Sequence, residues 1–590
     1  MTSNHMWPPS RCPRTWQRLA AGAITVAVAC TVAGCQGLPT SGAVTEFEPH
    51  VPDERSLSLK GFGPQQGASA DVIVRDFLRA SAAGWSDDFQ VARAYLTETA
   101  NTAWKPETQV QIYANDALPE IVVAPPASPA TSGKANSATA TTPGAATSRD
   151  DLGGDTVEAS ISVAINAYVT PRGDYHVDTN RNAQTIHFTL IRTADEQWRI
   201  DSLPDSVLIS ESTFRTAFQQ SSVYFLAPDA AALVADMRWY PRRRLATYLM
   251  QALLDGPSPL LDGAVATAIP AGTQLPTHSV DIVDGVARVQ LSGASLMTSR
   301  DQALFNWQVR STLLQVPSVS DVSISIGGIG VVNTDVPSGP QYAMNTQVGL
   351  VDDHLVVVDG GATREIPLRD ATGIDVESVT TGPVHAAPIV MRRGDMIMRV
   401  DSSGNEVEVT QVPGAAVMSV DRLGYVWVLT NRRIVVTSEA NPLTLELPWT
   451  DAGDITDMRV SPDGARLLVT RSGTHPSVWM AAITRNAMGA PVSLGQAYRI
   501  EGIPGVPRDA SWAGNNTVAI LAAGAGGARV AIAQGLSVRD DFGAPDDAVA
   551  LSGGASENDL RLSTADGRSY QRAGVSWRNV DTLPSLHYPR

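Results

Sequence analysis

The chain has 590 residues, of which 43% are hydrophobic, and its formal net charge is −16 at pH 7. A chain of this length predicts more than one domain. The negative charge argues against binding to nucleic acid and against flat electrostatic binding to anionic lipid. All three cysteines lie near the N-terminus, at positions 12, 30 and 35.

The first 35 residues resemble an export signal, in which basic residues precede an apolar stretch. Arginines at positions 11, 14 and 18 precede an apolar stretch, residues 19–33, which is shorter than the roughly 20 residues that span a bilayer. The stretch closes with Val32-Ala33-Gly34-Cys35, which resembles a bacterial lipobox. The resemblance implies cleavage between Gly34 and Cys35, with S-diacylglycerol and an N-acyl chain added to Cys35. An ordinary secretory signal, with Cys35 present by chance, is the alternative.

Removal of the signal peptide, residues 1–34, would leave no thiol for a disulfide, a metal or a nucleophile, because Cys12 and Cys30 would leave with it. The remaining chain is long enough to bury a sufficient core without disulfides. Two acyl chains on Cys35 would anchor the protein to the membrane far more strongly than one chain would. We therefore expect a protein anchored by lipid to the extracytoplasmic face of the cell membrane.

Residues 35–68 predict a tether, because polar residues, proline and glycine interrupt any periodicity. A helix is expected from Ser69, a capping residue, to about Gly84, and a second one over residues 87–97. The apolar positions of the two helices are Ile73, Phe77 and Leu78 in the first and Phe89, Ala92 and Leu96 in the second.

Strands are expected next, at residues 109–114, 120–124, 157–169 and 185–201. Helices followed by a curved antiparallel sheet resemble the NTF2-like cone fold, so we assign residues 69–215 to an α+β domain of this kind. Residues 124–151 are almost entirely Ala, Ser, Thr, Pro and Gly, and they predict a disordered insertion in the sheet. A glycosylated stalk is the alternative for this insertion.

Residues 221–335 predict a second α+β domain. Two strands around a Pro-Asp turn come first, and a helix follows that ends at Gly256 and Pro257. Asp284-Gly285 suits the two-residue turn of a hairpin. A second helix is expected with Ala303, Leu304, Trp307 and Leu314 on its apolar face, and then a strand with Val322, Ile324 and Ile326 on one face.

Within this domain, "YLMQALLDGPS", then "VARVQLSG" and an amphipathic helix resemble the GerMN domain of germination and sporulation proteins. Together with the lipobox, "DVIVRDFLRAS", "VARAYLT" and "VYFLAPDAAALVADMRWYP", they make the chain similar to the LpqB family of actinobacterial lipoproteins. This resemblance implies a partner, the extracellular sensor domain of the MtrB histidine kinase. It also implies modulation of the MtrA/MtrB two-component system, with effects on envelope homeostasis and cell division.

Residues 340–590 predict an all-β domain of short strands between turns. Residues 421–430 align with residues 461–470 at an offset of 40, and residues 511–521 are a looser third copy. Periods of about 40–50 residues with several strands each are typical of β-propeller blades, and the span would hold about six of them. A pair of β-sandwiches is the alternative.

The sequence contains no motif that predicts catalysis. Its nine histidines have no close ligand spacing, and we find no nucleophile elbow or cofactor cradle. We therefore expect no catalytic residue, no metal and no cofactor. His187 is expected in a strand, residues 401–405 ("DSSGN") in a tight turn in preference to a calcium loop, and the arginines at 242–244 on a solvated face that could meet an acidic partner.

The leading hypothesis is thus an interaction protein that acts on a sensor kinase. The alternative is that the propeller binds or hydrolyses cell-wall glycan or peptide. The candidate ligand-binding residues for that alternative are Trp427, Trp479 and Trp512, each of which also suits a place in the core of a blade.

Overall fold

The computed structural model describes residues 61–125, 155–178, 183–277, 279–293, 297–332, 336–351, 354–368, 375–385, 387–430, 433–438, 442–448, 454–580 and 586–590. These residues belong to one compact unit. The signal peptide, Cys35, most of the tether and most of the 124–151 insertion lie outside the described ranges, so the predictions for them stay predictions. Within those ranges every helix is too short or too polar to cross a membrane.

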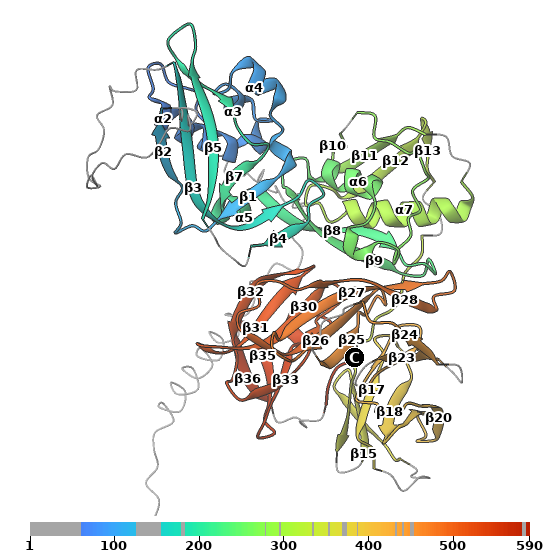
Figure 1. The fold of residues 1–590 in the computed structure, drawn as a ribbon. Coiled ribbons are helices and arrows are strands. Elements are labelled where there is room, and N and C mark those ends of the chain that lie inside the picture. The colour runs from blue at the N-terminus through green and yellow to red at the C-terminus, as the bar shows by residue number, and fades with distance from the viewer. Residues whose placement is uncertain are drawn as a thin grey trace, which may run out of the picture. The chain divides into compact units, whose positions relative to one another are not determined.

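The N-terminal domain consists of short helices and an antiparallel sheet (Figure 1). Its helices are α2 (Ala70–Ala82), α3 (Gln90–Arg93), α4 (Glu98–Ala103) and α5 (Glu211–Ala217). Its strands are β1 (Val110–Tyr113), β2 (Glu120–Ala124), β3 (Thr156–Val169), β4 (Tyr175–Val177), β5 (Ala183–Arg192), β6 (Trp198–Ser202) and β7 (Val207–Ser210). The sheet order is β6-β5-β3-β1-β7, with β2 and β4 also paired to β3. Only β1 and β7 are parallel, so the expected sheet is confirmed.

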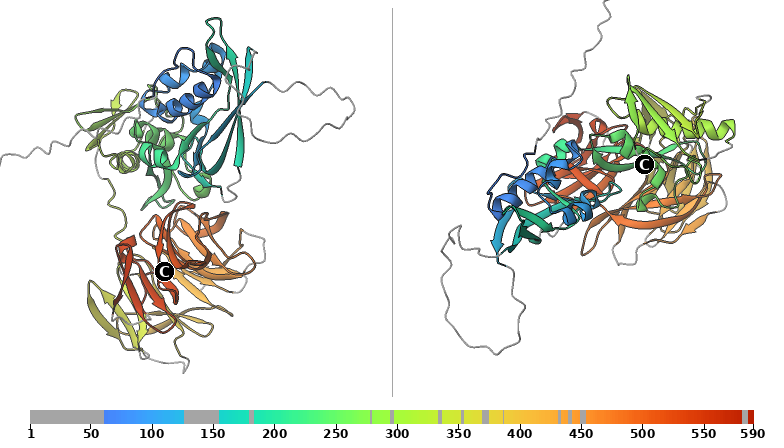
Figure 2. Two further views of the ribbon diagram at one scale, coloured as in Figure 1. Left: turned by 90° about the vertical axis from the view of Figure 1, so that its left-hand side faces the viewer. Right: turned by 90° about the horizontal axis from the view of Figure 1, so that it is seen from above.

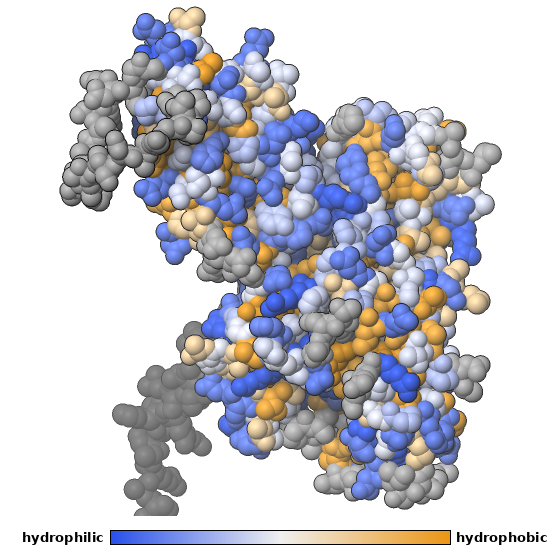
Figure 3. Space-filling view, in the orientation of Figure 1, coloured by the Kyte–Doolittle hydropathy of each residue, from blue (hydrophilic) through white to orange (hydrophobic). Residues whose placement is uncertain are grey.

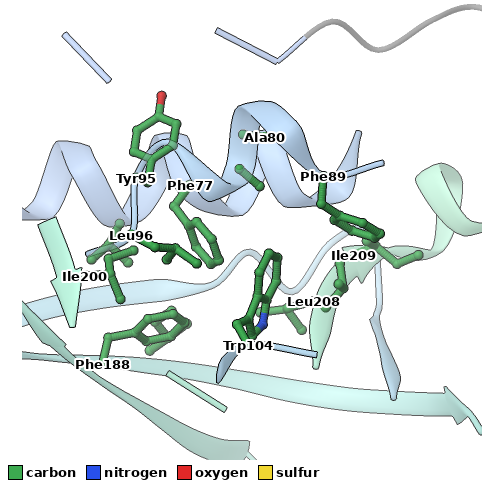
Figure 4. Packing of buried hydrophobic residues seen from close by; sticks show 14 of the residues in the cluster. Phe77, Ala80, Phe89, Tyr95, Leu96, Trp104, Phe188, Ile200, Leu208 and Ile209 are labelled. Atoms are coloured by element: carbon green, nitrogen blue, oxygen red, sulfur yellow. The ribbon is translucent and has the colours of Figure 1, made fainter. Parts of the chain in front are cut away.

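Aromatic side chains fill the space between α2 and this sheet (Figure 4). The Phe77 ring lies 5.4 Å from that of Trp104 and 6.0 Å from that of Phe188. Such offset and edge contacts add to the free energy gained by burying the rings. The interior of this cone-like domain is therefore a packed core.

The helix expected over residues 87–97 is much shorter than predicted. Only Gln90–Arg93 is helical, and Phe89 before it takes a positive φ of 62°. Leu96 leaves the helix to bridge Ile200. Phe89, Ala92 and Leu96 are nevertheless all buried, so the apolar positions were predicted correctly and the regular helix was not. Ser69 does stand at the N-cap of α2, but its hydroxyl donates to Asp71 and caps no backbone N–H.

The middle domain contains a hairpin, two helices and a four-stranded sheet. Its elements are β8 (Phe218–Leu226), β9 (Leu233–Pro241), α6 (Leu245–Asp255), β10 (Asp281–Val283), β11 (Val286–Leu291), α7 (Ser299–Leu313), β12 (Asp321–Ile326) and β13 (Ile329–Gly330). The sheet order is β10-β11-β12-β13. As predicted, Gly256 ends α6 with a positive φ, and Asp284 and Gly285 form the tight turn with φ values of 53° and 75°.

Helix α7 has the predicted position, but its buried face is centred on other residues. Of the predicted apolar positions, Ala303 is buried, Leu304 and Trp307 are half-buried and Leu314 is 41% exposed, whereas Phe305, Val309 and Leu313 are fully buried. The buried face also carries polar side chains, because they satisfy backbone groups of neighbouring segments. The Tyr224 N–H group of β8, for example, donates to the Thr312 hydroxyl at 3.1 Å, and the Ser222 N–H group donates at 2.8 Å to the side chain of Gln315, which follows the helix.

The C-terminal domain is formed by six sheets in sequence order (Figure 2). The first three are β14 (Gln347–Val351), β15 (His354–Asp359), β16 (Ala362–Ile366); β17 (Ser378–Thr381), β18 (Ile389–Arg393), β19 (Met396–Val400), β20 (Glu406–Gln411); and β21 (Val417–Val420), β22 (Val426–Leu429), β23 (Ile434–Thr437), β24 (Leu443–Leu445). The last three are β25 (Ile455–Val460), β26 (Arg466–Arg471), β27 (Ser477–Arg485), β28 (Pro491–Arg499); β29 (Val506–Trp512), β30 (Thr517–Gly524), β31 (Gly527–Gln534), β32 (Ser537–Gly543); and β33 (Ala548–Ser552), β34 (Arg561–Thr564), β35 (Ser569–Ala573), β36 (Ser576–Val580).

These sheets are the blades of a propeller, and the pair of β-sandwiches is excluded. Each sheet is antiparallel, and the first strands of successive sheets, β14, β17, β21, β25, β29 and β33, contact one another in series. The first strands are therefore the inner ones. Residues 421–430 and 461–470 occupy matching places, since both span the turn between the first and second strands of a blade.

Candidate functional site: the propeller axis

The last residues of the chain lie against the inner strands of the propeller, and the C-terminal label falls among its strands in Figure 1 and in the left-hand view of Figure 2. His587 exchanges two backbone hydrogen bonds of 3.0 Å with Val348 of β14, so it forms an antiparallel bridge on the inner side of the three-stranded first blade. Tyr588 N–H donates to Ser552 Oγ of β33 at 2.9 Å. Residues 586–588 thereby join the first blade to the sixth.

Arg590 extends these contacts to the second and third blades. Its N–H donates to the Thr381 carbonyl oxygen of β17 at 3.3 Å, and its own carbonyl oxygen accepts from Val420 N–H of β21 at 2.7 Å. A five-residue segment thus contacts the inner strands of four blades directly, and the centre of the propeller is occupied by the chain's own residues.

A buried ionic cluster connects the remaining two blades. Arg459 on β25 contacts Asp457 Oδ2 through Nε at 2.8 Å and Asp509 Oδ1 of β29 through Nη2 at 3.0 Å. Its Nη1 donates to Ser511 Oγ at 2.6 Å. The three charged side chains are at most 13% exposed. Because every charge has a hydrogen-bonded partner, the cluster can exist inside a protein, where an unpaired charge would be very costly.

The two carboxylates of this cluster have pKa values displaced in opposite directions. Burial opposes the ionised form of Asp457, but Arg459 and Arg590 outweigh it and hold the Asp457 pKa below its ordinary value. Burial, together with the negative charge of Asp457, raises the pKa of Asp509. Asp457 therefore carries more of the negative charge of the pair than Asp509 does.

His587 lies next to this cluster. Its Nε2 is 2.8 Å from the Val379 carbonyl oxygen, and its Nδ1 is 2.9 Å from that of Tyr588. Burial and the positive charge of Arg590 lower the pKa of His587 to about 4, although both carbonyl groups favour the charged ring. His587 is consequently neutral at pH 7.

The tryptophans considered as ligand-binding residues have structural contacts. Trp427 is fully buried, and its Nε1 donates to Asp421 Oδ2 at 3.2 Å. Trp512 is 3% exposed, and its Nε1 donates to the Arg459 carbonyl oxygen at 3.2 Å. Trp479 is half-buried and donates to Ser477 Oγ at 2.9 Å. Each indole N–H therefore has a partner within the propeller, as expected of a structural residue.

Other residues considered in the sequence have simple structural roles. His187 is exposed on β5, 3.3 Å from Ser160 Oγ. Asp401 Oδ1 accepts from the N–H groups of Ser403 and Asn405 at 2.8 and 3.0 Å, which is the predicted tight turn. In the stretch 242–244, Arg244 pairs with Asp88 at 3.3 Å, so one of these arginines contacts an acidic group of the same chain.

Among the described residues, no group of three or more His, Cys, Asp or Glu side chains is placed to hold a metal ion. The axial cluster was not predicted from the sequence, although one feature of the sequence could have indicated it. Asp457, Arg459 and Asp509 are charged residues inside the strands β25 and β29 of the propeller. Charges at such positions are seldom buried without partners, so they predict an internal ionic network.

Three known families match successive parts of the chain. Residues 63–215 match the N-terminal domain of lipoprotein LpqB, residues 222–331 match the domain of sporulation and spore germination, and residues 353–589 match the β-propeller domain of lipoprotein LpqB. This chain belongs to the LpqB lipoprotein family. The family resemblance expected from the sequence is therefore confirmed, and a lipoprotein family implies a protein anchored to a membrane.

Relatives from several actinobacteria agree with this family. LpqB of Bifidobacterium longum is 26% identical over 499 residues, which cover 80% of each chain. LpqB of Thermobifida fusca is 26% identical over 87% of this chain and 81% of its own. LpqB of Cutibacterium acnes is 30% identical over 52% of this chain and 46% of its own.

Among solved structures, virginiamycin B lyase from Staphylococcus aureus aligns with a TM-score of only 0.27 and 14% identity. The alignment covers 36% of this chain and 70% of the lyase, and it carries no functional argument.

Proposed function

We propose that this chain is a lipid-anchored extracytoplasmic accessory protein that binds the sensor domain of an MtrB-type histidine kinase. By binding, it modulates MtrA/MtrB signalling and so affects envelope homeostasis and cell division. Membership of the LpqB lipoprotein family supports the anchor, and acylated Cys35 would provide it. Such an anchor would hold the protein at the membrane surface, where it must be to contact a membrane-embedded kinase.

The observation that carries a binding role is the occupied propeller axis. Residues 586–590 contact the inner strands of four blades, and Arg459 with its two carboxylates links the other two. A propeller filled in this way offers its outer surface to other molecules instead of an open channel. We therefore place the kinase contact on the outside of the blades.

Exposed apolar side chains mark one part of that outer surface. Val407, Leu443 and Val492 are 63%, 42% and 52% exposed. They lie on β20, β24 and β28, the outermost strands of three successive blades. Polar and apolar residues are mixed over the visible face of the propeller, which suits a separable protein contact better than a permanent one (Figure 3).

The regulatory effect follows from differential binding. A bound protein can shift a kinase between signalling states only if it prefers one of them. A tenfold preference corresponds to about 1.4 kcal/mol, which is within the usual range of coupling between sites. The accessory protein therefore needs only a modest selectivity for one conformation of the sensor domain.

Site-specific crosslinking in cells tests this proposal. A photoreactive amino acid is placed at Val492 of the full-length chain and, as a matched control, at Val575, which is 80% exposed in the turn between β35 and β36. We expect the kinase among the products crosslinked from Val492 and its absence from the Val575 products. Recovery of other envelope proteins from both positions, without the kinase, would overturn the proposal.

A further inference from the structure

Two adjacent cavities with shared lining residues form a cleft that the proposed function does not use. Their volumes are about 110 and 280 Å³, and both are lined by Tyr175 of β4, Trp239 of β9, and Gln534 and Ser537, which flank the turn between β31 and β32. Together they have the size of a small-molecule site, and they lie at a junction of domains, where such sites are common. We propose that this cleft binds a neutral saccharide.

One wall of the cleft is aromatic. The rings of Tyr175 and Trp239 lie 5.9 Å apart, and Phe214 of α5 packs 5.7 Å from Tyr175 and 4.8 Å from Trp239. Phe214 is buried, whereas Tyr175 and Trp239 are half-buried and line the cavities. The supported rings can therefore present an apolar surface to one face of a flat ligand, as the C–H face of a sugar ring requires.

Polar groups around these rings have no partner in the protein. Within the described residues, the Asn166 carboxamide, the Tyr175 and Tyr498 hydroxyls and the Trp239 indole N–H make no hydrogen bond, although all four side chains are half-buried beside the cleft. Half-buried groups of this kind usually find a partner. Burial raises the pKa of both tyrosines, so both hydroxyls are neutral at pH 7 and can donate.

The three arginines that line the cleft are already paired. Arg215 binds Glu211 at 2.8 Å, Arg539 binds Glu557 at 2.8 Å and Asp540 at 2.5 Å, and Arg466 binds Asp463. No unpaired arginine among the described lining residues is therefore available for a phosphate or a nucleotide. The free hydrogen-bonding capacity belongs to hydroxyl, amide and indole groups around aromatic rings, and this chemistry matches the hydroxyls of an uncharged sugar.

Two hydrogen bonds connect the propeller wall of the cleft to the other domains. Ser537 Oγ donates to the Tyr175 carbonyl oxygen at 3.2 Å, and Gln220 Nε2 donates to the Gln534 carbonyl oxygen at 3.4 Å. Neither contact uses the four unpartnered groups. A ligand can therefore bind between the aromatic wall and the turn 534–537 without breaking an existing hydrogen bond.

Calorimetric titration of the purified full-length chain in detergent micelles tests the inference. The probes are the neutral trisaccharides cellotriose and chitotriose, with trialanine as the peptide probe. The variant Asn166→Ala/Tyr498→Phe removes two polar groups of the cleft, and Tyr570→Phe, which removes a hydroxyl bound to Arg568 at 2.9 Å outside it, is the matched control.

We expect saturable binding of at least one trisaccharide, at least tenfold weaker binding by the double variant and unchanged binding by Tyr570→Phe. The melting temperature of each variant shows whether it is folded; if the double variant is not, Tyr498→Phe alone is titrated. The inference is overturned if neither trisaccharide binds, if the cleft variants bind as tightly as the native chain, or if only the peptide binds. Kinase crosslinking is a separate readout, so failure here leaves the proposed function standing.

Discussion

Arg422 Nη2 lies 2.8 Å from both carboxylate oxygens of Asp229, and the two side chains are only 4% and 12% exposed. Asp229 belongs to the turn between β8 and β9, and Arg422 to the turn between β21 and β22, so the pair links the middle domain to the propeller. Burial opposes ionisation of Asp229, but the hydrogen bond and charge of Arg422 hold its pKa below the ordinary value.

Replacing only one partner of this ion pair should lower the free energy of unfolding. Arg422→Met leaves the Asp229 carboxylate buried without its partner, and we expect a loss of about 3 kcal/mol in the free energy of unfolding. Adding Asp229→Asn should recover part of that loss, which a double-mutant cycle in urea denaturation measures. Arg243→Met, at an exposed position, is the control and should change little. Equal stability of Arg422→Met and Arg243→Met would contradict this role.

Trp427 should matter for stability and not for binding. Trp427→Phe keeps most of the buried ring but removes the hydrogen bond to Asp421, and we expect about 1–2 kcal/mol of destabilisation. Crosslinking to the kinase and trisaccharide titration should be unchanged. If the variant instead kept full stability and lost trisaccharide binding, the propeller would itself be the glycan site.

Acidification should destabilise the propeller through His587. Its pKa is about 4 in the folded chain against an ordinary 6.5, so the unfolded state binds the proton more tightly. The stabilising contribution is complete above pH 6.5 and is lost as the pH falls toward 4, by no more than about 3 kcal/mol. Asp509 acts in the opposite sense, because its raised pKa favours the protonated folded state in acid.

The variant His587→Gln isolates this effect. It should lower the free energy of unfolding at pH 7, where the native contacts of His587 are intact, and the difference from the native chain should shrink as the pH falls to 4.5. Urea denaturation at several pH values measures the difference. A constant difference across this range would mean that His587 does not titrate as its surroundings predict.

Cys35→Ser should abolish the membrane anchor. Serine lacks the thiol that carries the diacylglycerol, so we expect no processing after Gly34 and no acylated product by mass spectrometry. Cys12→Ser is the matched control, since position 12 lies in the same predicted signal peptide, and this variant should be processed normally. A Cys35→Ser chain that is still cut at this bond and retained in the membrane would contradict the lipobox.

Local patterns in the sequence predicted most elements of the fold. The turn at Asp284-Gly285 needs positive φ at two adjacent residues, and the helix stop at Gly256 needs it at one, so both depend on residues next to each other in the chain. The repeat of residues 421–430 at 461–470 likewise revealed the blades, because each blade builds the same turn between its first two strands.

The features that the sequence did not predict have a common physical reason, because they depend on contacts between distant segments of the chain. The buried face of α7 is set by the hydrogen bonds that Thr312 and Gln315 make to β8, about 90 residues away in the chain. In the same way, residues 586–590 reach strands as distant as β14, and no local pattern marks them as a closing segment. The cleft at Tyr175 and Trp239 also requires three segments to meet, so the sequence did not reveal it.

Titration of the purified kinase sensor domain into the full-length chain in detergent micelles is the decisive measurement of kinase binding. We expect saturable binding that Val492→Arg weakens at least tenfold and that Val575→Arg leaves unchanged. The opposite result would be no saturable binding of the sensor domain by a chain that is folded and correctly acylated at Cys35.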